Sequence, residues 1–125
     1  MTLQGVIDKV DRLKANMMSR QDKISYINEI EGIFHQEMVL KCRHTEAQEE
    51  RPVYDDTTEG STVLLAPSPY DSMYEYYLMA KIDMLNQEPE KEYNNMARFE
   101  KAYGELCDYW RREHMPITPI QQFYF

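Results

Sequence analysis

The sequence predicts a mainly α-helical fold: a four-helix bundle-like domain with a possible short β-hairpin between its second and third helices and an extended C-terminal arm. Apolar residues recur every three or four positions along most of the chain, which is the spacing of one buried helix face. A serine or threonine stands before three of these stretches, where its side chain can cap a helix. The expected helices cover residues 2–15, 20–43, 69–87 and 89–115.

The length of 125 residues suits one domain with a single modest core. We assign residues 1–116 to this domain and residues 117–125 to the arm. Prolines at 116 and 119 exclude a helix there, and a disordered tail normally lacks such a run of Ile, Phe and Tyr. The N-terminus has no signal-peptide pattern, no apolar run is long enough to span a membrane, and cysteines are sparse. These features predict a soluble, cytosolic protein with reduced thiols.

The first two helices have clear start signals. Thr2 can cap the first, and the spacing predicts that it ends near residues 15–16, where Asn16 takes a left-handed conformation. Ser19 can cap the second helix, with Asp22 in its first turn at the positive end of the helix dipole. The apolar face of the second helix consists of Ile24, Ile27, Ile30, Phe34 and Met38.

The third and fourth helices are expected to form an antiparallel hairpin around a corner at residues 87–89. Ser68 is the expected cap of the third helix, with Pro69 in its first position and Asp71 completing the capping box. This helix is apolar around much of its circumference, which is typical of a central helix. The apolar face expected for the fourth helix comprises Tyr93, Met96, Phe99, Tyr103, Leu106, Cys107 and Trp110.

The segment 45–66 breaks the helical pattern. Its first part, residues 45–61, is rich in carboxylates and is called the acidic loop below. Residues 52–54 and 62–65 favour extended structure, so they could pair as a β-hairpin, and a loop without regular structure is the alternative.

Composition limits the classes of partner. The formal net charge is −8, so the chain repels phosphate and tight direct binding of nucleic acid is not expected. Ten tyrosines accompany only four phenylalanines and one tryptophan. Tyrosine buries its ring while its hydroxyl stays hydrated, so it suits the half-buried seams of small bundles and of protein interfaces.

No catalytic or metal site is predicted. Zinc is bound by cysteine and histidine, and the chain offers Cys42, His44, Cys107 and His114. The spacing of these four residues does not fit the usual ligand pairs of a zinc site. A magnesium-dependent all-α nucleotide hydrolase would need paired carboxylates. Glu46 with Glu49 and Glu105 with Asp108 match in form only, since the first pair lies in the acidic loop. Motifs for a nucleophilic serine or a phosphate-binding loop are absent from the sequence. We therefore expect no enzyme activity, no cofactor and no metal.

The stretch from Leu64 to Pro116 carries a set of packing and capping motifs. These are Leu64–Asp71 (LLAPSPYD), Met73–Tyr74, Tyr77–Leu78, Ala80, Ile82–Asp83, Tyr93–Asn95, Phe99, Tyr103 and Trp110–Pro116 (WRREHMP). With them the chain resembles the head–tail connector, or adaptor, proteins of tailed bacteriophages and prophages of Firmicutes. The resemblance covers about residues 2–116 and leaves out the arm and much of the acidic loop.

The resemblance implies a structural subunit that assembles into a dodecamer-type ring between the portal protein and the tail or a second connector. Such a ring continues the DNA channel, so DNA passes through it without sequence-specific binding, and no membrane is involved. The expected location is the head–tail junction of the virion, after synthesis in the cytoplasm of the bacterial host. Rings of this kind use two different faces of each subunit.

Two groups of residues follow as candidates for this role. For contact with a neighbouring subunit or the portal, the candidates are Tyr76, Phe123, Tyr124 and Phe125. For an acidic lining of the channel, they are Glu49, Glu50, Asp55, Asp56 and Glu59. The alternative function is that of a small acidic helical binding module, such as an antitoxin or an inhibitor that masks a basic partner. The magnesium-dependent nucleotide hydrolase is a third and weaker hypothesis.

Overall fold

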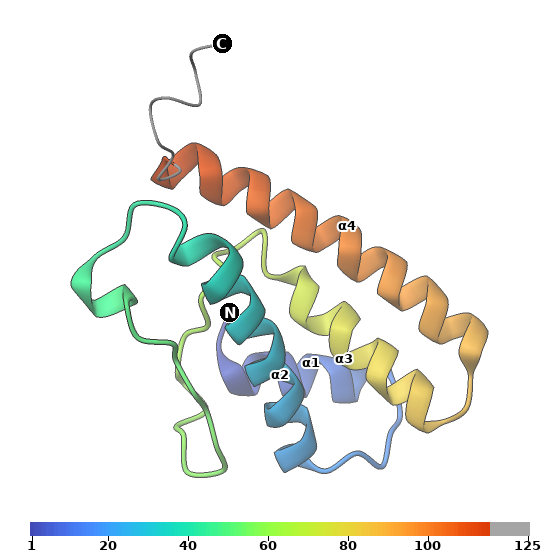
Figure 1. Ribbon diagram of the computed structural model, residues 1–125. Coiled ribbons are helices and arrows are strands. Elements are labelled where there is room, and N and C mark those ends of the chain that lie inside the picture. Colours follow the sequence, from blue (N-terminus) through green and yellow to red (C-terminus); the bar gives the residue numbers. More distant parts are fainter. Residues whose placement is uncertain (116–125) are drawn as a thin grey trace.

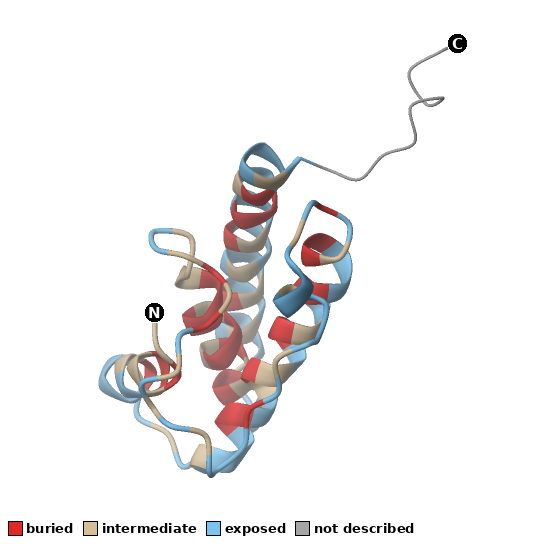
Figure 2. Ribbon diagram, turned by 90° about the vertical axis from the view of Figure 1, so that its left-hand side faces the viewer, coloured by how far each residue is buried: buried red, intermediate tan, exposed pale blue. Residues whose placement is uncertain are grey.

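A hairpin of two helices, of which the first is central and the second lies along one side, organises the structure, a computed structural model that describes residues 1–115. Helix α3 (Ser72–Leu85) and helix α4 (Pro89–His114) run antiparallel, and α1 (Leu3–Leu13) and α2 (Arg20–Phe34) also contact α3 (Figure 1). Helix α3 is therefore buried along most of its length (Figure 2). The mainly helical fold and the central position of the third helix are confirmed.

The corner between α3 and α4 is tight and well bonded. The Gln87 N–H donates to the carbonyl of Met84 over 3.2 Å, and the Glu88 N–H donates to the carbonyl of Asp83 over 2.9 Å. Gln87 has a φ of 56°, which is the left-handed region. Pro89 then opens α4, as expected, because its fixed φ suits the first helical position.

The start of α3 differs from the prediction. Ser68 does not cap the helix, and Pro69 is not its first residue, because α3 begins at Ser72 with Asp71 at the cap position. The Tyr70 N–H bonds to the carbonyl of Pro67 over 2.8 Å, which closes a turn before the helix. The ring of Tyr70 stacks on Tyr109 of α4, with centroids 4.4 Å apart, so the turn is fastened to the neighbouring helix.

Helix α1 begins as predicted but ends earlier. The Thr2 hydroxyl accepts from the Gly5 N–H over 3.0 Å. The helix stops at Leu13, where Lys14 turns to an extended conformation with a φ of −144° and its ammonium group pairs with Asp83 on α3. Asn16 does not adopt the left-handed conformation; its side chain instead bonds to the carbonyl of Lys14.

Helix α2 starts at the predicted cap, since the Asp22 N–H donates to the Ser19 hydroxyl over 3.1 Å. The prediction that it continues to residue 43 is wrong. Regular helix ends at Phe34 and is followed by a π-helical turn, η1 (His35–Val39). The ring of His35 bonds to the carbonyl of Gln48 over 2.7 Å, and this contact ties the wide turn to the acidic loop.

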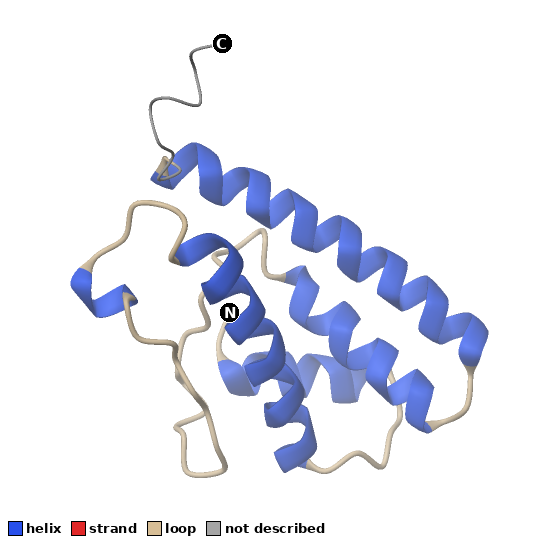
Figure 3. Ribbon diagram, in the orientation of Figure 1, coloured by secondary structure: helices blue, strands red, loops and turns tan. Residues whose placement is uncertain are grey.

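The possible β-hairpin is not confirmed. Within residues 1–115 the only regular element between α2 and α3 besides η1 is a short 3₁₀-helix, η2 (Glu46–Gln48), and Figure 3 shows no strand. Both expected strands find other partners. The backbone N–H and carbonyl of Tyr54 bond to the side chain of Asn28 on α2 over 2.8 and 2.7 Å. Thr2 and Val63 form an isolated antiparallel bridge, so residues 62–64 pair with the start of the chain.

Aromatic rings fill the seam between α2, α3 and α4. Phe34 packs edge-on against Trp110 with centroids 5.0 Å apart, and Phe99 lies 5.0 Å from Tyr77 and 5.8 Å from Tyr103. Such pairs add about 0.5–1.5 kcal/mol each beyond the burial of their area. Tyr93 was expected on this face but is 75% exposed, because it lies in the first turns of α4, near the tip of the hairpin.

In residues 1–115, no helix combines the length and the apolar character that crossing a bilayer requires.

The strained corner gives a first prediction. Replacing Gln87 with glycine should raise the free energy of unfolding by roughly 0.5–1 kcal/mol, because glycine adopts a positive φ without the steric cost that glutamine bears. Urea denaturation followed by circular dichroism measures this change. The matched control is Asn86→Gly, at a φ of −82°, where glycine should instead lower stability. Equal effects of the two substitutions would show that Gln87 carries no strain.

Candidate functional site

The two cysteines lie inside the core. Cys42 and Cys107 are free thiols with exposed fractions of 1% and 7%, and burial raises the pKa of both. Neither thiol is thereby activated as a nucleophile, because the reactive form is the thiolate. In the part of the chain that the structure describes, no three His, Cys, Asp or Glu side chains are arranged to hold a metal ion.

The two histidines considered as zinc ligands make separate local contacts. The ring of His44 bonds to the carbonyl of Cys42 and to the carboxylate of Glu49, each over 2.7 Å. These two bonds raise the pKa of His44 above its usual value. The ring of His114 stacks on Trp110 with centroids 3.9 Å apart, and its Nδ1 lies 3.1 Å from the carbonyl of Trp110.

The carboxylate pairs considered for magnesium are fully on the surface. Glu46, Glu49, Glu105 and Asp108 are all exposed. The Asp108 carboxylate accepts from the guanidinium of Arg111 over 3.2 Å. The four groups do not converge on a common site within residues 1–115.

The most strongly bonded polar group in the core is the carboxylate of Glu31, whose exposed fraction is zero. It accepts from the hydroxyls of Tyr54 and Tyr74 over 3.0 and 2.5 Å, and from the Leu65 N–H over 3.0 Å. Burial raises the pKa of Glu31, and the three hydrogen bonds offset only part of that effect. The donors come from the acidic loop, the segment before α3, and α3 itself. Glu31 therefore fastens these three segments to α2.

A second buried carboxylate, that of Asp83 on α3, joins three helices. Its exposed fraction is zero, and it pairs with Lys14 at the end of α1 and accepts from the Asn95 amide of α4 over 2.7 Å. A further ion pair joins Lys9 of α1 to Glu75 of α3 over 2.8 Å. A buried ion pair specifies geometry more than it adds stability, so these contacts set how the helices meet.

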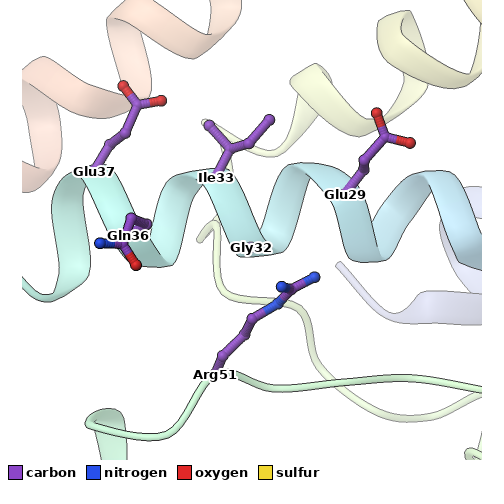
Figure 4. Close-up of a pocket in the computed structure, with 6 residues that line it drawn as sticks. All are labelled: Glu29, Gly32, Ile33, Gln36, Glu37 and Arg51. Carbon is purple, nitrogen blue, oxygen red and sulfur yellow. The ribbon is translucent and has the colours of Figure 1, made fainter.

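An open groove of about 420 Å³ runs along the outer face of α2. Figure 4 shows Glu29, Ile33 and Glu37 pointing the same way from the helix, while Arg51 of the acidic loop approaches Gly32. A Cβ atom at position 32 would lie 2.5 Å from the guanidinium carbon of Arg51, so glycine is what permits this approach. The groove holds no nucleophile, and both carboxylates already accept from tyrosines of α3 and α4.

The acidic-loop candidates are all exposed, but they differ in their contacts; they are Glu49, Glu50, Asp55, Asp56 and Glu59. Asp55 accepts from the backbone and hydroxyl of Thr57, which lowers its pKa. Asp56 lies 3.7 Å from the guanidinium of Arg20, whereas Glu50 and Glu59 form no ion pair within residues 1–115. Their expected position in a channel concerns an assembly and stays a prediction.

Tyr76 lies half-buried on α3, where it lines a pocket of about 260 Å³ against α4. Its expected role at an interface concerns an assembly and stays a prediction. The other three interface candidates, Phe123, Tyr124 and Phe125, lie outside the described residues.

Sequence reasoning missed the buried carboxylates. The signal for Glu31 was present, because it stands four residues after Ile27 and three before Phe34, within the apolar face of α2. A charged residue at such a position is normally paired or hydrogen-bonded when it is buried. Asp83 similarly follows Ile82 in a helix that is apolar almost all round.

Comparison with known proteins gives no relative: no protein-family model, no curated protein and no solved structure matches this chain.

The bonding of Glu31 predicts a large effect of its removal. Glu31→Leu should lower the free energy of unfolding by about 2–4 kcal/mol, because two hydroxyls and one backbone N–H lose their acceptor. The control is Gln21→Leu, on the same helix but exposed, which should cost less than about 1 kcal/mol. Chemical denaturation measures both values, and equal losses would contradict the assigned role of Glu31.

The raised pKa of Glu31 also predicts how stability depends on pH. Its folded-state pKa exceeds the ordinary value of 4.5, so the folded protein holds this proton more tightly than the unfolded chain does. The resulting stabilisation is complete below the ordinary pKa and is lost as the pH rises through the folded-state pKa. Glu31→Gln removes the titration. The stability advantage of the wild type over this variant should therefore shrink as the pH rises above the ordinary pKa of a glutamate. A difference that grows with pH would show that the pKa is lowered instead.

Proposed function

We propose that this chain is a structural subunit of the head–tail junction of a tailed bacteriophage or prophage. In this role it assembles into a ring between the portal protein and the tail or a second connector. The ring continues the channel through which DNA passes, and the subunit performs no catalysis. The net charge of −8 supports such passage, because an acidic wall does not retain phosphate.

The observation that carries the proposal is the resemblance of the stretch from Leu64 to Pro116 to connector proteins. Most of this stretch folds as the α3–α4 hairpin, the central element of the molecule. Its motifs therefore specify the framework of the domain, and similar motifs in another chain would support a similar framework.

Exposed apolar side chains near the tip of this hairpin also support a role in assembly. Met84 and Leu85 at the end of α3 are 45% and 56% exposed, and Tyr93 near the start of α4 is 75% exposed. Neighbouring apolar side chains on a surface are typical of contact sites, and tyrosine is enriched at interfaces.

A small acidic regulator is the second candidate, and the acidic loop favours it. Exposed carboxylates at Glu46, Glu50 and Glu59 could mask a basic partner such as a nuclease. The two functions differ in stoichiometry: a regulator forms a compact complex with one partner, whereas a connector forms a ring.

Mixing the full chain with the portal protein of the same phage or prophage genome tests the proposal. We expect ring-shaped complexes in negative-stain electron microscopy, with many copies of this chain for each portal assembly. A chain that binds neither the portal nor the tail proteins, alone or together, would overturn the proposal. Co-purification with a single nuclease or toxin in an equimolar complex would favour the regulator.

Tyr76 gives a prediction within the same assay. Tyr76→Ala should leave the circular dichroism spectrum unchanged but reduce ring formation at least about fivefold, because an aromatic anchor at an interface contributes more than about 1 kcal/mol. Tyr76→Phe keeps the aromatic side chain and serves as the matched control. If Tyr76→Ala assembles as the wild type does, Tyr76 belongs to the core alone.

A further inference from the structure

We propose that copies of this chain associate head to tail, with the acidic loop of one copy seated in a basic groove of the next. The basic groove consists of two adjoining pockets between α3 and α4, lined by Lys14, Lys91, Arg98, Lys101, Glu105 and Tyr76 among others. The inference rests on the proposed function, for which it names the contact that would close the ring.

The charge of the groove is the first observation. The two pockets, of about 260 and 290 Å³, meet at Arg98, which lines both. Four cationic side chains and one exposed carboxylate line them, although the chain as a whole carries a net charge of −8. Concentrating cations at one place in so acidic a chain creates a local site for carboxylates.

Two of the four cations are available for a partner. Lys14 is paired with the buried Asp83, and Lys91 pairs with Glu88 over 2.6 Å. Arg98 and Lys101 are both exposed, and neither forms an ion pair within residues 1–115. They lie one helical turn apart on α4, so both point to the same groove. A guanidinium group can also bind a carboxylate through two parallel hydrogen bonds.

The acidic loop is the matching surface. Glu46, Glu50 and Glu59 are exposed, and within residues 1–115 they have no cationic partner. The loop is held in place by the Tyr54 and Asn28 contacts described above, so little conformational entropy is lost when it docks.

The acidic loop and the basic groove are formed by different parts of the chain. In Figure 1 the acidic loop (green) lies to the left of α2, which it contacts through Asn28, and most of α4 lies to the right of α2. The groove is lined by residues of α3, α4 and the end of α1. Within residues 1–115 no ion pair joins the two surfaces of one chain. Association through two different faces is heterologous, and it closes into a ring when the rotation between copies divides a full turn.

This arrangement replaces the channel-lining role that the sequence suggested for Glu50 and Glu59. Carboxylates seated on a neighbouring subunit do not line a channel. It also gives Tyr76 a place in the contact, since Tyr76 lines the same pocket as Arg98 and Lys101.

Charge reversal tests the pairing. Arg98→Glu with Lys101→Glu, and separately Glu50→Lys with Glu59→Lys, should each weaken self-association at least about tenfold, because each places like charges opposite one another. The chain with all four changes keeps the wild-type net charge and should associate again. Lys41→Glu with Arg112→Glu is the matched control, because it alters the net charge as the groove variant does but at exposed residues outside the groove. Sedimentation velocity measures association, and circular dichroism checks folding.

Zero-length carbodiimide cross-linking detects the contact when association is weak. An equal mixture of ¹⁵N-labelled and unlabelled chains should yield mixed-isotope cross-links between Lys101 and a carboxylate of the acidic loop. Lys101→Arg keeps the charge but removes the amine, so these cross-links should disappear while association remains.

The outcomes separate this inference from the proposed function. Three results would overturn the inference. Self-association could be unaffected by both charge reversals, it could fail to return when all four changes are combined, or neither method could detect it. If the groove variant loses portal binding but keeps self-association, the groove receives the portal, and only the inference fails. If the reversal pattern holds but no portal or tail protein binds, the head-to-tail contact stands and the connector function fails.

Discussion

The structure depends on one buried carboxylate. Glu31 of α2 accepts hydrogen bonds from Tyr54, Leu65 and Tyr74, which belong to the acidic loop, the segment before α3, and α3 itself. The long connection has no strands and is held besides by a few contacts at its edges, such as those of Tyr54 with Asn28 and of Gln48 with His35. The desolvation of the Glu31 carboxylate costs free energy, but this carboxylate also gives the three buried donors a hydrogen-bond acceptor. A chain of this size has a small core, so one fully bonded polar centre can decide where such a connection lies.

Asp83 plays the corresponding part at the other end of α3. Its bonds to Lys14 and Asn95 explain why α1 ends where it does and how α4 is oriented against α3. The aromatic seam fills the space between these two polar centres. The conformation of the domain is therefore set by directional bonds at both ends of α3 and by packing in its middle. The residues on the outer faces of α2 and α4 take no part in these contacts, so the two faces can carry different charges.

Periodicity was sufficient to predict the helices, the central place of α3 and the corner before Pro89, because each depends on residues close in sequence. The errors have tertiary causes. Helix α1 ends early because Lys14 pairs with Asp83. A turn replaces the first residues expected of α3, and Tyr70 of this turn stacks on Tyr109. Tyr54 bonds to Asn28 instead of pairing as a strand. The groove around Arg98 and Lys101 could not be foreseen, since it needs the relative rotation of α3 and α4, which the spacing of apolar residues does not specify.

The burial of both cysteines has a practical consequence for spectroscopy. Thiol reagents attack the thiolate, and the raised pKa values of Cys42 and Cys107 keep both groups protonated and shielded at neutral pH. A single cysteine introduced on the surface would react with a maleimide dye or spin label much faster than either native thiol. Distances between labelled sites can therefore be measured in the folded protein without first removing its own cysteines.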